Sequence, residues 1–368
     1  MASSLALYPP TPIHVVVVGA GFGGLTTAIE CHLKGHKVTV LERCAEWHRL
    51  GDICSLGKLK SGYPYLSTKI LHYSPPGNRK KRVSDTFACI SGPNAGCIIS
   101  RYPSDLVGEK MRSVSINCGR LKLFTHTGGF ILEQVFASNP DRPSYSGRRG
   151  ELHKILYDYA LTLGIPIRMG VNVTEYHEDS TGAWVGLGGK HAGDVIRGDV
   201  VVAATGFRSP AKKLILEMHS WGYGSRSHGK DSYSLARRQG ETEREHEGGG
   251  KEEDVGRTWE ERDTGYAIYR GWYDTAQCGL DKDPLAKVFT EGDTHMGWLG
   301  EDIHFLAASV KKGKEISWVA THPVKERWAG KVGDEGGDGE YWVKPIEKDA
   351  SEVLKSFDGW DPICGAIV

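Results

Sequence analysis

The chain has 368 residues and a formal net charge of zero, with 46 basic and 46 acidic residues. This length is enough for two domains or one large α/β domain. The balanced charge argues against nucleic acid or an anionic membrane as a partner, and no apolar run is long enough to span a bilayer. The eight cysteines are dispersed without a C-x-x-C pair, so we expect neither a disulfide framework nor a metal site, and we expect a cytoplasmic location.

The first predicted elements form a βαβ unit between residues 13 and 50. A β-branched run ends in Gly19-Ala-Gly21-Phe-Gly-Gly24, and a helix-like segment follows. Gly35 ends that segment, and a second apolar run finishes in Glu42. A G-x-G-x-x-G sequence between a strand and a helix is typical of dinucleotide-binding folds.

Each part of this unit has a predicted role. Gly19 permits the tight turn, Gly21 lets the backbone approach a pyrophosphate, and Gly24 lets the helix pack close to the sheet. The helix N-terminus offers free N–H groups to the phosphates. Glu42 is placed to accept hydrogen bonds from ribose hydroxyls and would repel a 2′-phosphate, so FAD or NAD is favoured over NADP. The alternative is an ordinary glycine-rich strand-turn-helix.

The middle of the chain contains two segments without a regular hydrophobic period. Residues 55–86 and 221–262 are rich in glycine, proline, serine or charge, and we expect them to be disordered inserts. The patterned stretches predict a short helix from residue 94, antiparallel strands within 121–136, a helix over 151–163, strands within 165–196, and a buried parallel strand over 199–204. Short strands are predicted again at 266–270, 304–308 and 316–320.

The whole pattern resembles the FAD-dependent aromatic monooxygenases, the group of p-hydroxybenzoate and salicylate hydroxylases. Besides the N-terminal unit, the resemblance rests on Arg149-Gly-Glu-Leu-His153, on Thr205-Gly-Phe-Arg208 and on Tyr266-Ala-Ile-Tyr269-Arg270. A late Gly359-Trp-Asp-Pro adds support. The resemblance covers roughly residues 13–54, 87–220 and 263–368.

This resemblance implies an α/β fold, in which a Rossmann-like FAD-binding domain is interleaved with a mostly antiparallel β-sheet substrate domain. The FAD-binding domain would comprise residues 13–54 and 145–220. The substrate-binding sheet domain would comprise residues 87–144 and 263–368. The two unpatterned segments would belong to neither.

The resemblance also implies an enzyme that uses FAD, NAD(P)H and O₂ to hydroxylate an aromatic or polyketide-type small molecule in secondary metabolism. Glu42 would hold the ribose, Gly51 would lie where the backbone approaches the flavin, and Arg149 would contact the cofactor. Arg208 would stabilise a phenolate or carboxylate of the substrate, and Tyr269 would hydrogen-bond it. A turn-capping role for Arg208 and a plain sheet role for Tyr269 are equally open. His153 is interpreted as a cap or packing residue rather than a base.

Departures from the family pattern leave other interpretations open. Thr205 stands where the family carries an acid before glycine, and no G-D-A-A-H-P type segment follows Pro362, so the C-terminal FAD-binding segment is expected to be lacking. The unpatterned segments suggest inserts or retained non-coding sequence. The alternatives are another FAD- or NAD-dependent oxidoreductase, and a truncated, non-catalytic remnant of the family.

Overall fold

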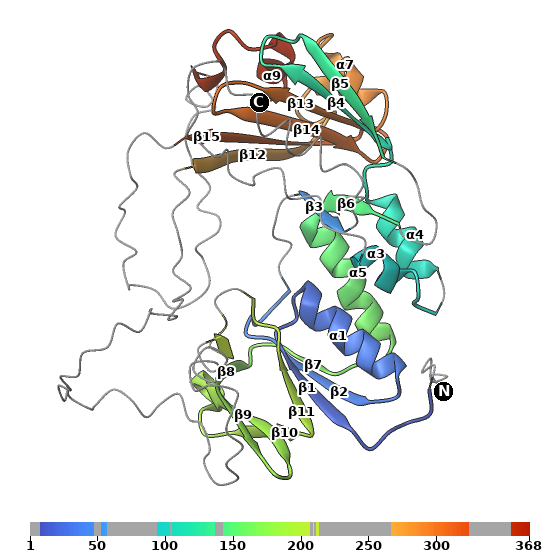
Figure 1. Cartoon of the computed structure of the whole chain (residues 1–368), viewed down its shortest axis with the longest axis vertical. Coiled ribbons are helices and arrows are strands. Elements are labelled where there is room, and N and C mark those ends of the chain that lie inside the picture. Colours follow the sequence, from blue (N-terminus) through green and yellow to red (C-terminus); the bar gives the residue numbers. More distant parts are fainter. Residues whose placement is uncertain are drawn as a thin grey trace, which may run out of the picture. The chain divides into compact units, whose positions relative to one another are not determined.

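The computed structural model describes residues 8–47, 53–56, 94–103, 105–136, 143–206, 209, 211–212, 266–323 and 355–368. The chain separates into two compact units, one made of residues 1–49 and 152–260 and the other of residues 50–151 and 261–368 (Figure 1). Gly51 and Arg208 lie outside the described residues. So do both expected inserts, apart from Ser55 and Leu56, which are part of a strand.

The first unit is built on a four-stranded parallel sheet with the strand order β11-β1-β2-β7 (Figure 1). Its elements are β1 (His14–Val18), α1 (Phe22–Leu33), β2 (Lys37–Leu41), β7 (Ile167–Arg168), β11 (Val200–Ala203) and α5 (Arg149–Thr162), whose first three residues belong to the second unit. A three-stranded antiparallel sheet contains β8 (Asn172–Asp179), β9 (Gly182–Gly188) and β10 (Val195–Gly198), with the short helix η1 (Gly189–His191) after β9.

Strand β1 is buried from Val15 to Val18 because both of its faces are covered. Val16 and Val18 pack in one cluster with Val173 and Val185 of the antiparallel sheet. Helix α1 contacts β1 and β2, and its small residue Ala28 is fully buried. Burial on two faces explains why this strand is a continuous β-branched run rather than an alternating one.

Strand β11 is parallel to β1, as the sequence predicts, but the prediction that it is buried is wrong. Val200 is 46% exposed, and Ala203 is exposed as well. Among the described strands β11 lies at the edge of the sheet, so one of its sides has no neighbouring strand. Its valines therefore reflect the strand preference of β-branched residues rather than burial on two faces.

The second unit is built on a six-stranded sheet with the order β12-β15-β14-β13-β4-β5. All neighbouring strands described in it are antiparallel except β13 and β4, which are parallel. The strands are β4 (Arg120–Thr125), β5 (Phe130–Val135), β12 (Tyr266–Asp274), β13 (Thr294–Leu299), β14 (His304–Val310) and β15 (Glu315–Pro323). The expected α/β class with an interleaved, mostly antiparallel sheet is confirmed.

The second unit also contains smaller elements. A two-stranded antiparallel ribbon joins β3 (Ile53–Leu56) and β6 (Tyr145–Arg148). The helices are α3 (Asn94–Ile99), α4 (Leu106–Ser113), η2 (Leu280–Lys282), α7 (Lys287–Thr290), η3 (Lys355–Phe357) and α9 (Pro362–Ala366). The predicted helix from residue 94 is present, whereas the sequence pattern did not predict α4.

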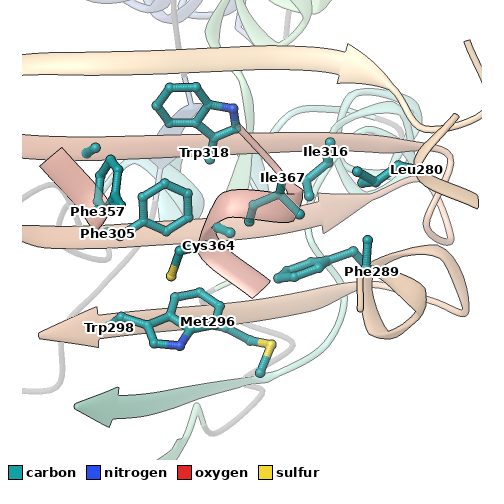
Figure 2. Close-up of a cluster of buried hydrophobic side chains, with 13 residues drawn as sticks. Leu280, Phe289, Met296, Trp298, Phe305, Ile316, Trp318, Phe357, Cys364 and Ile367 are labelled. Atoms are coloured by element: carbon teal, nitrogen blue, oxygen red, sulfur yellow. The ribbon is translucent and has the colours of Figure 1, made fainter. Parts of the chain in front are cut away.

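One face of the six-stranded sheet carries the core of the second unit (Figure 2). The buried cluster includes Phe289, Met296, Trp298, Phe305, Ile316, Trp318, Phe357, Cys364 and Ile367. The indole N–H of Trp298 donates to the carboxylate of Asp361 at 2.8 Å, and the same carboxylate accepts from the amide of Ile363 at 3.1 Å. Asp361 thus caps α9 and connects that helix to the sheet, which gives the Trp-Asp-Pro sequence at 360–362 a structural role.

An ion-pair cluster joins the start of α5 to the sheet. The Nζ atom of Lys311, in the turn between β14 and β15, donates to Glu151 at 2.8 Å and to Glu315 at 2.7 Å. The indole N–H of Trp272 donates to the other carboxylate oxygen of Glu315 at 2.8 Å, and the guanidinium of Arg148 lies 5.3 Å from the centre of that indole ring. The Lys311, Glu151 and Glu315 side chains are at most one quarter exposed. The cluster therefore fixes the β6–α5 junction on the sheet.

Substitution of Lys311 by methionine tests this cluster, because it leaves two part-buried carboxylates without their shared cation. We expect the free energy of unfolding, measured in urea, to fall by about 2 kcal/mol. The control, Lys287→Met, removes an exposed ion pair with Glu291 and should change it by less than about 0.5 kcal/mol. Equally small changes for both variants would show that the cluster contributes no stability.

The pH dependence of this effect follows from two pKa shifts. Desolvation raises the pKa of Glu315, but the hydrogen bonds from Lys311 and Trp272 outweigh it, so the pKa lies below its ordinary 4.5. Desolvation lowers the pKa of Lys311, but its two carboxylate partners outweigh it, so the pKa lies above 10.5. The cluster stabilises the fold fully between pH 4.5 and pH 10.5, the ordinary pKa values of the two groups. This stabilisation is lost as pH falls through the folded pKa of Glu315 or rises through the folded pKa of Lys311. The effect of Lys311→Met should shrink at both extremes.

Candidate functional site

The candidate site lies at the carboxyl ends of β1, β2 and β11, where the chain turns from β1 into α1. Strand β1 has β2 on one side and β11 on the other, and all three are parallel. Ligands bind to open α/β sheets at such a switch point, outside the carboxyl ends of the strands. The structure brings Gly19, Gly21, Gly24 and Glu42 together at this edge.

Close backbone contacts require glycine at two of these positions. Gly19 has a φ of +102°, and a Cβ there would lie 2.6 Å from the carbonyl oxygen of Ala204. A Cβ on Gly24 would lie 1.8 Å from the carbonyl oxygen of Gly19. The end of β1, the start of α1 and the residue after β11 therefore meet in direct backbone contact, and the predicted roles of Gly19 and Gly24 acquire a geometric cause.

Gly21 differs from the other two glycines because the fold does not need it. Its φ of −70° and ψ of −178° suit any residue, and a Cβ there would meet nothing within 4 Å. The N–H groups of residues 22–24 have no acceptor within the helix, and no described residue accepts a hydrogen bond from the Gly21 N–H. An exposed glycine beside open amides fits an anionic group such as a pyrophosphate.

The carboxylate of Glu42 lies beside this turn. Its Oε2 accepts a hydrogen bond from the amide of Ala20 at 2.7 Å, and its Oε1 accepts one from the amide of Cys44 at 2.9 Å. Two backbone bonds hold the carboxylate in place, and each oxygen keeps a lone pair for a further donor. The side chain is half-buried, so ribose hydroxyls could reach it.

His153 also reaches the turn, a contact that the sequence analysis missed. Its Nε2 lies 2.6 Å from the carbonyl oxygen of Ala20, and its Nδ1 lies 3.0 Å from Nε1 of Trp47. The ring of Phe22 meets the imidazole edge-on, with 5.4 Å between ring centres. The sequence gives no signal for this cluster, because His153 lies more than 100 residues from both Ala20 and Trp47 along the chain.

The remaining predicted site residues lie either in the second unit or outside the described residues. Arg149 belongs to the second unit, where it is the exposed first residue of α5. Tyr269 lies in β12 of the same unit, is half-buried, and packs against the core cluster of the sheet. Gly51 and Arg208 cannot be placed, because they are outside the described residues.

Comparison with known proteins agrees with this geometry. Residues 14–47 match the family model described as FAD binding domain. Asperlicin C monooxygenase of Petromyces alliaceus is 24% identical over 310 residues, which cover 84% of this chain and 50% of that protein. Notoamide E oxidase notB′ of Aspergillus versicolor is 32% identical over 359 residues, covering 96% of this chain and 59% of that protein. Other fungal relatives are named FAD-dependent monooxygenases.

The fold is shared with solved flavoprotein structures. The crystal structure of CtdE in complex with FAD superposes with a TM-score of 0.60 at 24% identity, over 97% of this chain and 68% of that one. The expected resemblance to FAD-dependent monooxygenases and the expected FAD-binding unit are therefore confirmed. The chain spans about half the length of the curated relatives it matches. None of the helices in the described part of the chain has the length and apolar character needed to cross a membrane.

Alanine substitutions at Gly21 and Gly24 separate binding from folding. Gly21→Ala should leave the thermal unfolding midpoint unchanged but weaken FAD binding, because its methyl group enters the open space beside the amides. Gly24→Ala should lower the free energy of unfolding by about 3 kcal/mol, since its methyl group overlaps a backbone carbonyl. Thermal unfolding and FAD titration of both variants provide the measurement. Undiminished FAD affinity in Gly21→Ala would contradict the assignment of this turn.

Proposed function

We propose that this chain acts as an FAD-dependent monooxygenase that uses NAD(P)H and O₂ to hydroxylate an aromatic or polyketide-type small molecule. The glycine turn at 19–24 carries the proposal, because its open amides and the adjoining Glu42 suit the pyrophosphate and ribose of FAD. The FAD-binding match and the names of the fungal relatives support it. Those relatives do not favour another oxidoreductase or a non-catalytic remnant.

Within this proposal the first unit binds the cofactor and the second unit binds the substrate. The first unit binds FAD, with the first-turn amides of α1 on the pyrophosphate and Glu42 on the ribose. Arg149 at the start of α5 and the backbone at Gly51 complete the cofactor contacts. The second unit supplies the substrate sheet. Its ion-pair cluster at Lys311 fixes the β6–α5 junction, and so the residue next to Arg149.

The chemistry divides between cofactor and chain. Bound FAD would accept a hydride from NAD(P)H and activate O₂, so that one oxygen atom enters the aromatic ring and the other leaves as water. Arg208 offsets the negative charge of a phenolate or carboxylate, and the hydroxyl of Tyr269 donates a hydrogen bond to it. Both residues bind and orient the ring. Exclusion of water from the sheet face favours transfer of the oxygen atom to the substrate over loss of activated oxygen without product.

The cofactor site is tested by the visible absorbance of the purified, desalted protein, with the released cofactor identified by chromatography. We expect FAD in the wild type and a weakened affinity, by about tenfold or more, in Glu42→Ala, because hydrogen bonds to a charged carboxylate are lost. Glu46→Ala, which changes an exposed acid nearby, serves as control. A colourless wild-type protein that takes up no FAD would overturn the proposal.

The substrate residues are tested by NAD(P)H oxidation in the presence of phenols and aromatic carboxylates such as salicylate. Tyr269→Phe and Arg208→Ala should each slow substrate-stimulated oxidation by about tenfold while FAD stays bound. Tyr273→Phe is the contrasting variant, because the Tyr273 hydroxyl donates to the carbonyl of Ile367 and serves the core. That variant should lose stability and keep its turnover. Loss of FAD from Arg208→Ala would move Arg208 to the cofactor site.

A further inference from the structure

We propose that His153 is a positioning residue for the cofactor turn: its imidazole holds the carbonyl of Ala20, so that the Gly21 N–H of the same peptide faces the pyrophosphate. This inference deepens the proposed FAD site and rests on it for the identity of the ligand. Its geometric part stands on contacts within the first unit alone.

The peptide between Ala20 and Gly21 links the carbonyl of one residue to the amide of the next. This peptide is planar and trans, so its C=O and N–H point in opposite directions. Nε2 of His153 lies 2.6 Å from the Ala20 oxygen and thus fixes the direction of both groups. The Gly21 N–H is therefore left facing away from His153, and no described residue accepts a hydrogen bond from it.

Trp47 determines which nitrogen of His153 carries the proton. The indole N–H of Trp47 can only donate, and it lies 3.0 Å from Nδ1, so Nδ1 is an acceptor and bears no proton. A neutral imidazole then carries its proton on Nε2, which is the nitrogen that meets the Ala20 carbonyl. The near-parallel stacking of the two rings, at 13°, holds the imidazole in this orientation.

Three other backbone groups of the turn have partners close by in the fold. The Gly19 amide donates to Leu41 at 2.7 Å, the Ala20 amide donates to Glu42, and the Gly21 carbonyl accepts from Leu25 at 2.9 Å. The Ala20 carbonyl instead relies on a side chain from α5. Ala20 is only 4% exposed, so without His153 its carbonyl would be buried without a partner, and the peptide would reorient to find one.

The test uses three variants of the full chain and two measurements. His153→Leu removes the donor, His153→Gln restores an amide N–H at a similar reach, and His177→Leu is the control, since His177 stacks on Trp184 in the same unit at 12° without contacting the turn. The first measurement is the dissociation constant for FAD from flavin fluorescence. The second is hydrogen exchange of the peptide spanning residues 19–25 without FAD.

We expect His153→Leu to weaken FAD binding about five- to tenfold and to speed exchange in the turn, with His153→Gln recovering most of both and His177→Leu changing neither. An unchanged dissociation constant and unchanged exchange in His153→Leu would overturn the inference. Loss without rescue by Gln would also overturn it, because the hydrogen bond would then not be the cause. If the wild type binds no FAD, the proposed function fails, while the exchange measurement still decides the role of His153.

Discussion

The approach of three backbone segments at Gly19 is the constraint on which the first unit depends. The carbonyl of Ala204 occupies the space of a Cβ on Gly19, and the carbonyl of Gly19 occupies the space of one on Gly24. Helix α1 can therefore begin directly at the end of β1, with its unpaired first-turn amides at the sheet edge. Any side chain at Gly19 or Gly24 would push the helix away from the strand and disturb the alignment of these amides. The open amides at this turn are thus a consequence of packing.

Ala20, which lies between Gly19 and Gly21, has both of its backbone polar groups bonded to side chains. Glu42 at the end of β2 accepts its N–H, and His153 on α5 meets its C=O. A turn held in this way is ordered before a ligand arrives, so binding loses less conformational entropy. The second unit gains its order differently, from an aromatic core on one sheet face and from an ion-pair cluster around Lys311.

The sequence predicted the parts of the fold whose causes are local. The β1–α1–β2 unit follows from a buried β-branched run, a glycine pattern and the spacing to Glu42, and the predicted helix over 151–163 differs from α5 by two residues or fewer at each end. Contacts between distant residues were not predictable. The reach of His153 to Ala20 depends on how α5 packs, and the exposure of β11 depends on its place at the sheet edge. The functional assignments remain predictions, both for the cofactor contacts and for the substrate contacts; the residues concerned are Gly19, Gly21, Gly24, Glu42, Gly51, Arg149, Arg208 and Tyr269.

The pairing of β1 with β11 also determines when this site can form during synthesis. The amide of His14 bonds to the carboxylate of Asp199, 185 residues later, and Gly19 meets Ala204 just beyond it. A ribosome that adds about 5–20 residues per second needs on the order of ten seconds or more to cover that distance. Throughout that interval the nascent glycine turn has emerged without the segment that packs against it. Completion of the candidate cofactor site is therefore a late event on the ribosome, even though its glycine sequence is translated well before β11.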